Sequence, residues 1–146
     1  MGKVVEIGIS DIKGSQIQKV TQVEAFKGKG LLNDRKFKET NQKECQLTLI
    51  EIENIRYYNK ISKTNIPALD FRRNIITENV ELNLLLGKEF FVGIVKLKAH
   101  DFCRPCKYLQ GKLKQNNLVK ELWHKAGLRC EILTSGKINV GDIIKL

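Results

Sequence analysis

The chain has 146 residues and a net charge of +10 at pH 7. This length fits one domain, over residues 1–146, with a sizeable core. The basic surface attracts polyanions and small phosphorylated ligands alike. Because the few aromatic residues are not interleaved with the basic ones, as a stacking platform for nucleic acid requires, nucleic-acid binding is disfavoured.

The cysteine count and the N-terminus indicate the compartment. Four cysteines are too few for a disulfide scaffold at this length. Residues 1–6 hold no long apolar run followed by a small-residue cleavage site. No stretch has the apolar length needed to cross a membrane. We therefore expect a cytoplasmic protein with reduced thiols and no membrane partner.

The first part of the chain predicts strands and a basic loop. Apolar and polar residues alternate over 3–10 and again over 20–26, as in half-buried strands. Residues 27–36 then hold two glycines, four cations and the turn pair Asn33-Asp34. Successive backbone N–H groups in such a loop can form an anion-binding nest, but an ordinary glycine-bearing connection explains the sequence as well.

The middle of the chain predicts a strand, a helix and a second strand. Residues 45–50 form a short strand that leads into a helix over 51–61, where apolar residues recur at helical spacing. If residues 70–77 form a strand, Arg72 and Arg73 lie on opposite faces, and at least one of them can point to a site. Arginine suits bidentate recognition of phosphate or carboxylate. A surface ion pair with a neighbouring carboxylate is the alternative.

The last part predicts a long strand, a helix and a hairpin. Residues 88–99 form one strand that bends at Gly93. A short helix over 118–125 turns Trp123 inward, and 126–146 reads as strand, tight turn and strand. Many short strands with few helices predict a mainly β fold, a closed or nearly closed barrel, or a sandwich. We expect helices near 51–61 and 106–125.

The loop after the long strand carries the chain's most reactive chemistry. It holds Cys103 and Cys106, with Arg104 and Lys107 beside them. Neighbouring cations favour the thiolate, which is the form that acts as nucleophile or metal ligand. Pro105 restricts the backbone and stiffens the loop. These features favour a functional thiolate that binds a soft metal or a cofactor.

Three other readings of the two thiols stay open. They can be small buried hydrophobic residues. They can form a thioredoxin-like redox pair, although that motif belongs near the start of a βαβ unit. They can belong to a structural zinc site, which needs four ligands. The candidate zinc ligands are Cys103, Cys106, His100 and either Cys130 or His124.

In their order and spacing, these stretches resemble a MOSC domain, the domain named for the C-terminal part of molybdenum cofactor sulfurases. The resemblance covers almost the whole chain. The early loop is similar to the family's Gly-Asp-Arg turn, with Asn33 at the usual glycine. The other matching segments are 46–50, 71–75, 82–83, 86–88, 91–93, 105–106, 127–130 and 140–142.

The resemblance implies a β-barrel with a pocket for the molybdenum cofactor (molybdopterin), or for sulfur carried towards it. It implies that Cys106 ligates molybdenum or holds a persulfide, with Cys103 as a possible second ligand. The cofactor carries a phosphate, so other basic and polar residues become candidate contacts for it or another phosphate-bearing small molecule. These are Arg35, Arg72, Arg73, Asn74, Arg104, Lys107 and Arg129.

Two function classes follow from the resemblance. One is a small molybdenum oxidoreductase that reduces N-hydroxylated compounds with an external reductase. The other is a non-catalytic carrier of sulfur or cofactor for other molybdoenzymes. Mobilising sulfur from cysteine needs pyridoxal phosphate in a dedicated domain. We therefore expect no cysteine desulfurase activity from this chain alone, and pyridoxal phosphate only in a separate partner domain or cysteine desulfurase.

Overall fold

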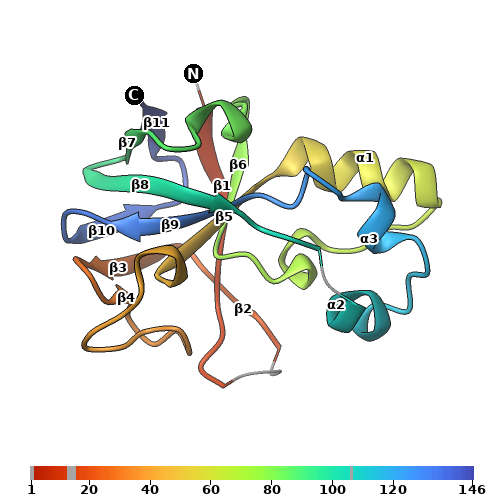
Figure 1. Cartoon of the computed structure of the whole chain (residues 1–146), viewed down its shortest axis with the longest axis horizontal. Helices are drawn as coiled ribbons and strands as arrows, with labels where there is room; N and C mark the ends of the chain where they lie inside the picture. The colour runs from red at the N-terminus through yellow and green to blue at the C-terminus, as the bar shows by residue number, and fades with distance from the viewer. Residues whose placement is uncertain (1, 13–15, 106) are drawn as a thin grey trace.

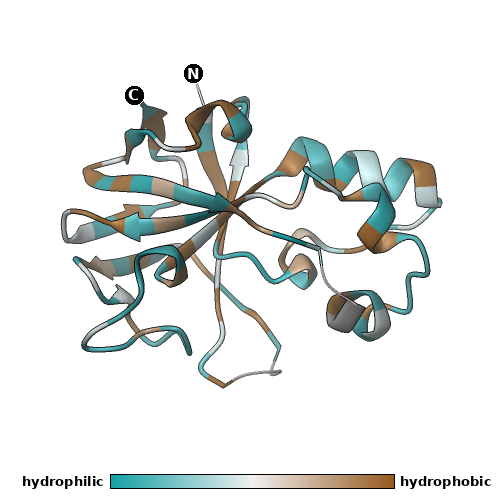
Figure 2. Cartoon of the chain, viewed as in Figure 1, coloured by the Kyte–Doolittle hydropathy of each residue, from teal (hydrophilic) through white to brown (hydrophobic). Residues whose placement is uncertain are grey.

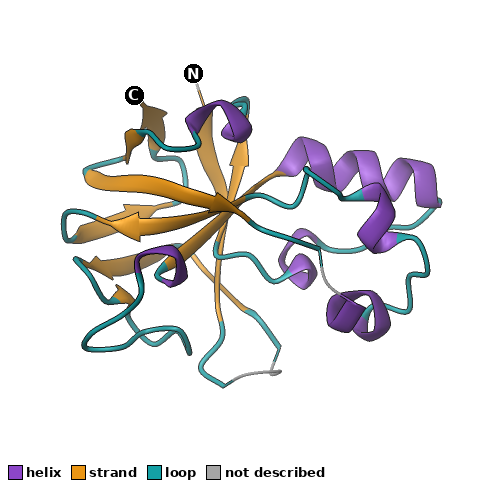
Figure 3. Ribbon diagram, viewed as in Figure 1, coloured by secondary structure: helices purple, strands orange, loops and turns teal. Residues whose placement is uncertain are grey.

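The computed structural model of the protein describes residues 2–12, 16–105 and 107–146, without the side chains of 107 and 108. Within these residues, strands gather in one body and the helices pack beside it (Figures 1 and 3). The strands are β1 (Gly2–Ile9), β2 (Gln18–Val20), β3 (Gln22–Phe26), β4 (Gly30–Leu31), β5 (Leu47–Glu51), β6 (Ile75–Glu78), β7 (Glu89–Val92), β8 (Val95–Phe102), β9 (Leu128–Ile132), β10 (Gly136–Asn139) and β11 (Ile143–Lys145). The helices are α1 (Ile52–Ser62), α2 (Lys107–Lys112) and α3 (Leu118–Glu121), and the 3-10 turns are η1 (Lys43–Cys45), η2 (Ala68–Phe71) and η3 (Leu82–Leu85). None of the helices in the described part of the chain is long and apolar enough to span a membrane.

Seven strands close into a barrel. Their order is β11-β7-β8-β9-β5-β6-β1, and β11 pairs with β1 to complete the ring. The β5–β6 pairing is parallel and the other pairings of the ring are antiparallel. Gly2 lies opposite Ile144, so the two ends of the chain lie near each other at the top of Figure 1. The prediction of a mainly β fold with a closed barrel and a few short helices is confirmed.

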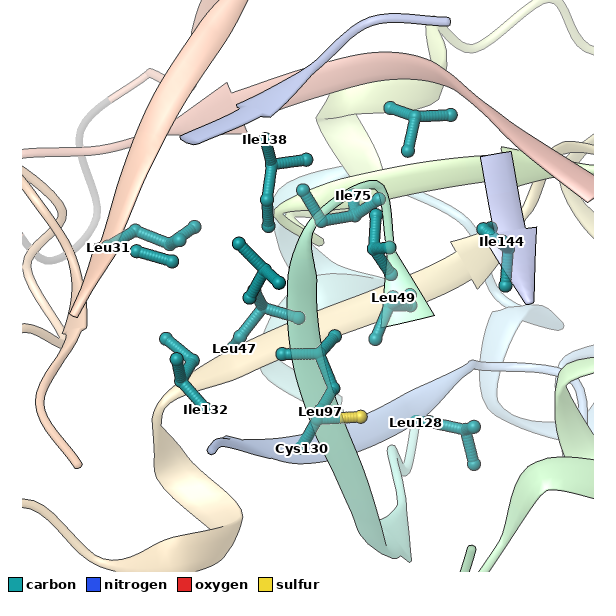
Figure 4. Packing of buried hydrophobic residues seen from close by; sticks show 14 of the residues in the cluster. Leu31, Leu47, Leu49, Ile75, Leu97, Leu128, Cys130, Ile132, Ile138 and Ile144 are labelled. Atoms are coloured by element: carbon teal, nitrogen blue, oxygen red, sulfur yellow. The ribbon is translucent and has the colours of Figure 1, made fainter. Parts of the chain in front are cut away.

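Side chains on opposite faces of the same strands belong to two hydrophobic cores. Figure 2 shows hydrophobic residues (brown) on both the strands and the helices. Leu47 and Leu49 of β5 lie in the barrel core with Cys130 of β9 (Figure 4). Ile50, the next residue of β5, lies in a second core with Ile55 of α1. A strand buried on both faces in this way anchors the helices to the barrel wall. The end of β5 runs directly into α1, so the barrel also places the helical side of the molecule.

Two predictions about strand pairing are wrong. The segment 126–146 is not a hairpin, because β9 pairs with β5 and β8 while β10 pairs with β3. A turn sequence indicates that the chain reverses, but strands that follow each other in sequence pair only in part of cases. The segment 88–99 is two strands rather than one bent strand. Gly93, at φ 61°, belongs to the tight turn that joins β7 to β8 as a hairpin.

Two local predictions are also wrong. Residues 70–77 are not one strand, because η2 occupies the start and β6 begins at Ile75. Arg72 between them takes a left-handed conformation, φ 65°, so it and Arg73 do not alternate across a sheet. Trp123 is half exposed, at 50%, and Leu122 is the inward residue at 1%. The helix ends at residue 121 rather than 125, which changes the direction of the residues after it.

Candidate functional site

The candidate site lies where β8 ends and where β5, β6 and β9 begin. Phe102 at the end of β8 lies opposite Leu128 at the start of β9. Beyond this pair the backbone N–H of Cys103 donates to the carbonyl of Gly127 at 2.8 Å. The Nε of Arg73 donates to the carbonyl of the preceding residue, Ala126, at 2.9 Å. The cysteine loop and the segment before β6 therefore meet over the same stretch of backbone.

The loop 33–36 is fixed by a buried carboxylate. Asn33 stands at φ 69°, in the left-handed region that glycine favours and that asparagine tolerates better than most residues. The turn therefore keeps a glycine-like conformation at this position. Asp34 is buried, and its carboxylate accepts from the backbone N–H of Ser10 at 3.0 Å and of Lys36 at 3.3 Å. These bonds hold Lys36 at the site.

Asn74 joins three strands beneath the site. Its Oδ1 accepts from the backbone N–H of Thr48 at 3.2 Å, and its Nδ2 donates to the carbonyl of Gly8 at 3.1 Å. The hydroxyl of Thr48 accepts from the Asn74 backbone N–H at 3.0 Å. The side chain is buried, so these bonds order β1, β5 and the start of β6. A direct contact of Asn74 with a cofactor stays a prediction.

A cavity of about 240 Å³, here called the cationic pocket, opens between these segments. None of the described residues that line it carries a carboxylate. Burial, and then the charges of Arg73 and Arg35, hold the pKa of Lys36 below its ordinary value. A ligand anion would counter that repulsion, because opposite charge favours the charged lysine. The lining residues are Lys36, Thr48, Arg73, Cys103, Arg104 and Arg129.

Protein contacts hold two of the pocket's arginines before any ligand binds. Arg129 donates through Nε to the carbonyl of Glu44 at 3.1 Å. Arg104 donates from Nη1 to Asp101 at 2.9 Å, and Nη1 of Arg129 lies 3.9 Å from the same carboxylate. The hydrogen bond from Arg104 is the main cause that lowers the pKa of Asp101. Fixed guanidinium groups lose less conformational entropy when they bind an anion.

Two further cavities adjoin the cationic pocket. The aromatic cavity, about 120 Å³, shares Cys103 and Arg104 with it and is otherwise lined by Phe102, Pro105, Trp123 and His124. The ring centroids of Trp123 and His124 lie 5.7 Å apart in an edge-to-face arrangement. The Cys45 cavity, about 240 Å³, shares Lys36 and Arg129 with the pocket and is otherwise lined by Arg35, Lys38, Asn41, Glu44 and Cys45. The three cavities together offer an apolar, planar surface at one end and positive charge at the other.

The structure brings some of the predicted residues together and separates others. Arg73, Arg104, Arg129 and Cys103 line the cationic pocket, whereas Arg35 lines the Cys45 cavity beside it. Arg72 is half-buried and does not appear among the residues that line any of the three cavities. Cys106 and the side chain of Lys107 lie outside the described residues.

Sequence reasoning missed Lys36 and Thr48 as lining residues. Lys36 was noted only as one of several loop cations, and a single threonine in a strand carries no site signal. For Lys36 the available signal was its place directly after the Asn33-Asp34-Arg35 turn, because a carboxylate that anchors a turn also fixes the residues around it.

The described ligands of the zinc alternative do not come together. Cys130 is fully buried in the barrel core, and burial raises the pKa of its thiol well above the ordinary value. The Nε2 of His100 instead contacts Glu131 at 2.7 Å. In the part of the chain that the structure describes, no group of three or more His, Cys, Asp or Glu side chains is placed to hold a metal ion.

Solved structures with the same fold come from several bacteria. The YuaD protein from Bacillus subtilis superposes with a TM-score of 0.83 at 17% identity, over 99% of this chain and 94% of that one. YiiM from Geobacillus stearothermophilus gives 0.79 at 18%, over 100% of this chain and 75% of that one. YiiM from Escherichia coli gives 0.74 at 17%, over 100% and 69%. A comparison with curated protein sequences gives no match.

The family is shown by sequence. The model of the MOSC domain matches residues 34–145, which is most of the chain. This span contains the described residues of the cationic pocket from Lys36 to Arg129. With the closed barrel, this match shows that the chain belongs to the MOSC domain family.

Proposed function

We propose that this protein binds the molybdenum cofactor and that the cationic pocket receives the cofactor's phosphate. The observation that carries the proposal is the pocket itself, where cations from separate segments surround about 240 Å³ and no described lining residue carries a carboxylate. Bidentate hydrogen bonds from arginine to phosphate are among the strongest polar contacts that proteins make. The MOSC family is associated with this cofactor, and the charges of the pocket suit it.

The residues around the pocket fit the other parts of the cofactor. Lys36, Arg73 and Arg129 would hold the phosphate, and the aromatic cavity would cover a planar ring. A soft thiolate suits molybdenum, which Cys103 or Cys106 would supply. When bound, the cofactor supplies the redox-active metal. The protein's own part is to bind and orient it and to limit the access of water, since Cys103 is only 5% exposed.

We propose further that the loaded protein reduces N-hydroxylated compounds with electrons from an external reductase. The half-exposed Trp123 at the edge of the aromatic cavity supports this, since a flat base can stack on an open aromatic surface. The alternative is a carrier that passes the cofactor or its sulfur to another molybdoenzyme. In either case sulfur comes from a partner cysteine desulfurase that uses pyridoxal phosphate.

Loading tests the proposal. The protein is purified from a host that makes molybdenum cofactor, and molybdenum and pterin are measured per chain. We expect both in the wild type, loss of molybdenum or sulfur loading in Cys106→Ser, and weaker pterin retention in Arg73→Gln. Arg56→Gln, on the exposed side of α1, removes the same charge elsewhere and should retain the cofactor. Wild-type protein without molybdenum and pterin would refute cofactor binding.

Turnover then separates enzyme from carrier. Loaded protein is mixed with a reductase and an N-hydroxylated base, and the amine product is measured by chromatography. Product that depends on the loaded protein supports the oxidoreductase. Loaded protein that yields no product, yet restores activity to a cofactor-free molybdoenzyme, supports the carrier and rejects the oxidoreductase.

A further inference from the structure

We propose that Cys45 is a modification site at which the protein exchanges thiol for disulfide with anionic low-molecular-weight disulfides, for which glutathione disulfide is the probe. The site is the Cys45 cavity, which lies beside the cationic pocket rather than within it. The modification does not depend on cofactor binding.

Exposure singles out Cys45 among the cysteines whose burial the structure gives. Cys45 closes η1 and is partly exposed, whereas Cys103 and Cys130 are buried. Its sulfur lines a cavity of about 240 Å³, from which a small disulfide can approach it. The Nη2 of Arg129 donates to Sγ at 3.3 Å and keeps the sulfur at the cavity wall.

The positive charge of the Cys45 cavity favours anionic disulfides. Among the described residues that line it, four are cations and one is a carboxylate, Glu44. The cations are Arg35, Lys36, Lys38 and Arg129. Glutathione disulfide carries more carboxylates than ammonium groups, so its net charge is negative at neutral pH. Positive clefts concentrate anionic reagents and raise their association rates. Cys45 should therefore react faster with an anionic disulfide than its exposure alone predicts.

The exchange is balanced without a further reactant. Cys45 loses its proton to solvent, and its sulfur attacks one sulfur of the reagent. A bond forms between Sγ and that sulfur while the disulfide bond of the reagent breaks. The departing thiolate takes up a proton. Cys45 is oxidised to a mixed disulfide, and one half of the reagent is reduced to the free thiol.

The adduct would also act on the neighbouring pocket. Lys36 and Arg129 line both cavities, so the carboxylates of a bound glutathionyl group would lie close to two cations of the cationic pocket. Anion binding there should weaken, which would make loading sensitive to the thiol–disulfide balance. This consequence rests on the proposed function, whereas the modification itself does not.

The test compares three reagents on the cofactor-free protein. Glutathione disulfide is anionic, hydroxyethyl disulfide is neutral and cystamine is cationic. The rate at Cys45 is followed by mass spectrometry of its peptide, so reaction at Cys106 is counted separately. Relative to the neutral reagent, we expect glutathione disulfide to react about 10-fold faster and cystamine more slowly, with the difference shrinking at about 0.5 M salt.

Lys38→Gln is the matched variant, because Lys38 is exposed and lines the Cys45 cavity without lining the cationic pocket. Lys38→Gln should lower the rate of glutathione disulfide relative to hydroxyethyl disulfide about threefold and leave the rate of hydroxyethyl disulfide unchanged. Arg56→Gln should change neither rate.

Equal rates for the anionic and cationic reagents, or no adduct at Cys45, would overturn the site. If the Cys45 adduct and the unmodified protein bind phosphate with the same affinity, the proposed coupling between the Cys45 cavity and the cationic pocket is overturned. Failure of the unmodified protein to bind phosphate would count against the proposed function alone.

Discussion

Replacing Arg73 with glutamine is the sharpest perturbation of the cationic pocket. The side chain keeps an amide near the position of the guanidinium but loses its charge and its fork of donors. The bond from Nε to the Ala126 carbonyl is lost, which we expect to lower the free energy of unfolding by about 1 kcal/mol. That loss leaves most of a typical domain's stability, so the variant should fold.

The expected loss of anion affinity follows from one charged contact. Hydrogen bonds to charged groups contribute about 1.5–3 kcal/mol, so the Kd for phosphate should rise about 10- to 150-fold. Arg73 is also one of the charges that lower the pKa of Lys36. In the variant the pKa of Lys36 should therefore move towards its ordinary value. This shift favours the charged form of Lys36, so the expected loss of affinity comes from the missing guanidinium.

Titration of cofactor-free protein with inorganic phosphate measures the effect, by calorimetry or by NMR shifts. Arg56→Gln is the control, because it changes the net charge equally from an exposed position on α1. At about 0.15 M salt its effect should stay below about twofold, since distant exposed charges are screened. If both variants weaken phosphate binding equally, the anion responds to the general field of a basic protein. The assignment of the pocket would then fail.

Three further predictions concern the scaffold beneath the site. Asn74→Ala leaves the buried backbone N–H of Thr48 without its acceptor and should lower the free energy of unfolding by about 2–4 kcal/mol. Urea unfolding measures this loss. A loss under about 0.5 kcal/mol would contradict the role of the Asn74 amide. Gly127→Ala should lower the melting temperature by more than about 10 °C, because Gly127 stands at φ 102° and a Cβ there would collide with the Leu49 carbonyl. A melting temperature equal to that of the wild type would count against this packing. Burial, followed by neighbouring carboxylates, raises the pKa of Glu51 above its ordinary 4.5, so the folded state binds more protons than the unfolded state between 4.5 and the raised value. The stabilisation from protonated Glu51 is complete below pH 4.5 and is lost as the pH rises through the raised pKa. Glu51→Gln should therefore gain stability relative to the wild type as the pH rises from 4.5 through that raised pKa. A stability difference that does not change with pH in urea unfolding would rule this out.

The sequence by itself determined the local elements and the chemistry they carry. Period-two alternation predicted the strands near 3–10 and 20–26, and helical spacing predicted the helix over 51–61. These signals are local, since neighbouring residues on one strand or helix must share a buried face wherever that element packs. The abundance of cations and the place of the cysteine loop directly after a strand were also visible without a structure.

Strand pairing was decided only by the tertiary structure. Gly2 lies opposite Ile144 across the closure of the barrel, a contact between the two ends of the chain. No local pattern encodes such a partner, because every strand edge offers the same backbone hydrogen bonds. The hydrophobic faces decide which edges can meet once all strands must share one core. For the same reason β10 pairs with β3 rather than with β9.

The candidate site shows the same division. Arginine was identifiable as a phosphate ligand, but the sequence did not distinguish Arg73 in the cationic pocket from Arg72 beside it. The 3-10 turn before β6 and the left-handed conformation of Arg72 determine that Arg73, rather than Arg72, lines the pocket. Closure of the barrel then brought Lys36, Arg73 and Arg129, far apart in the chain, around one cavity. Residue types determine which anion contacts are possible, and the ring of paired strands determines which of them share a cavity.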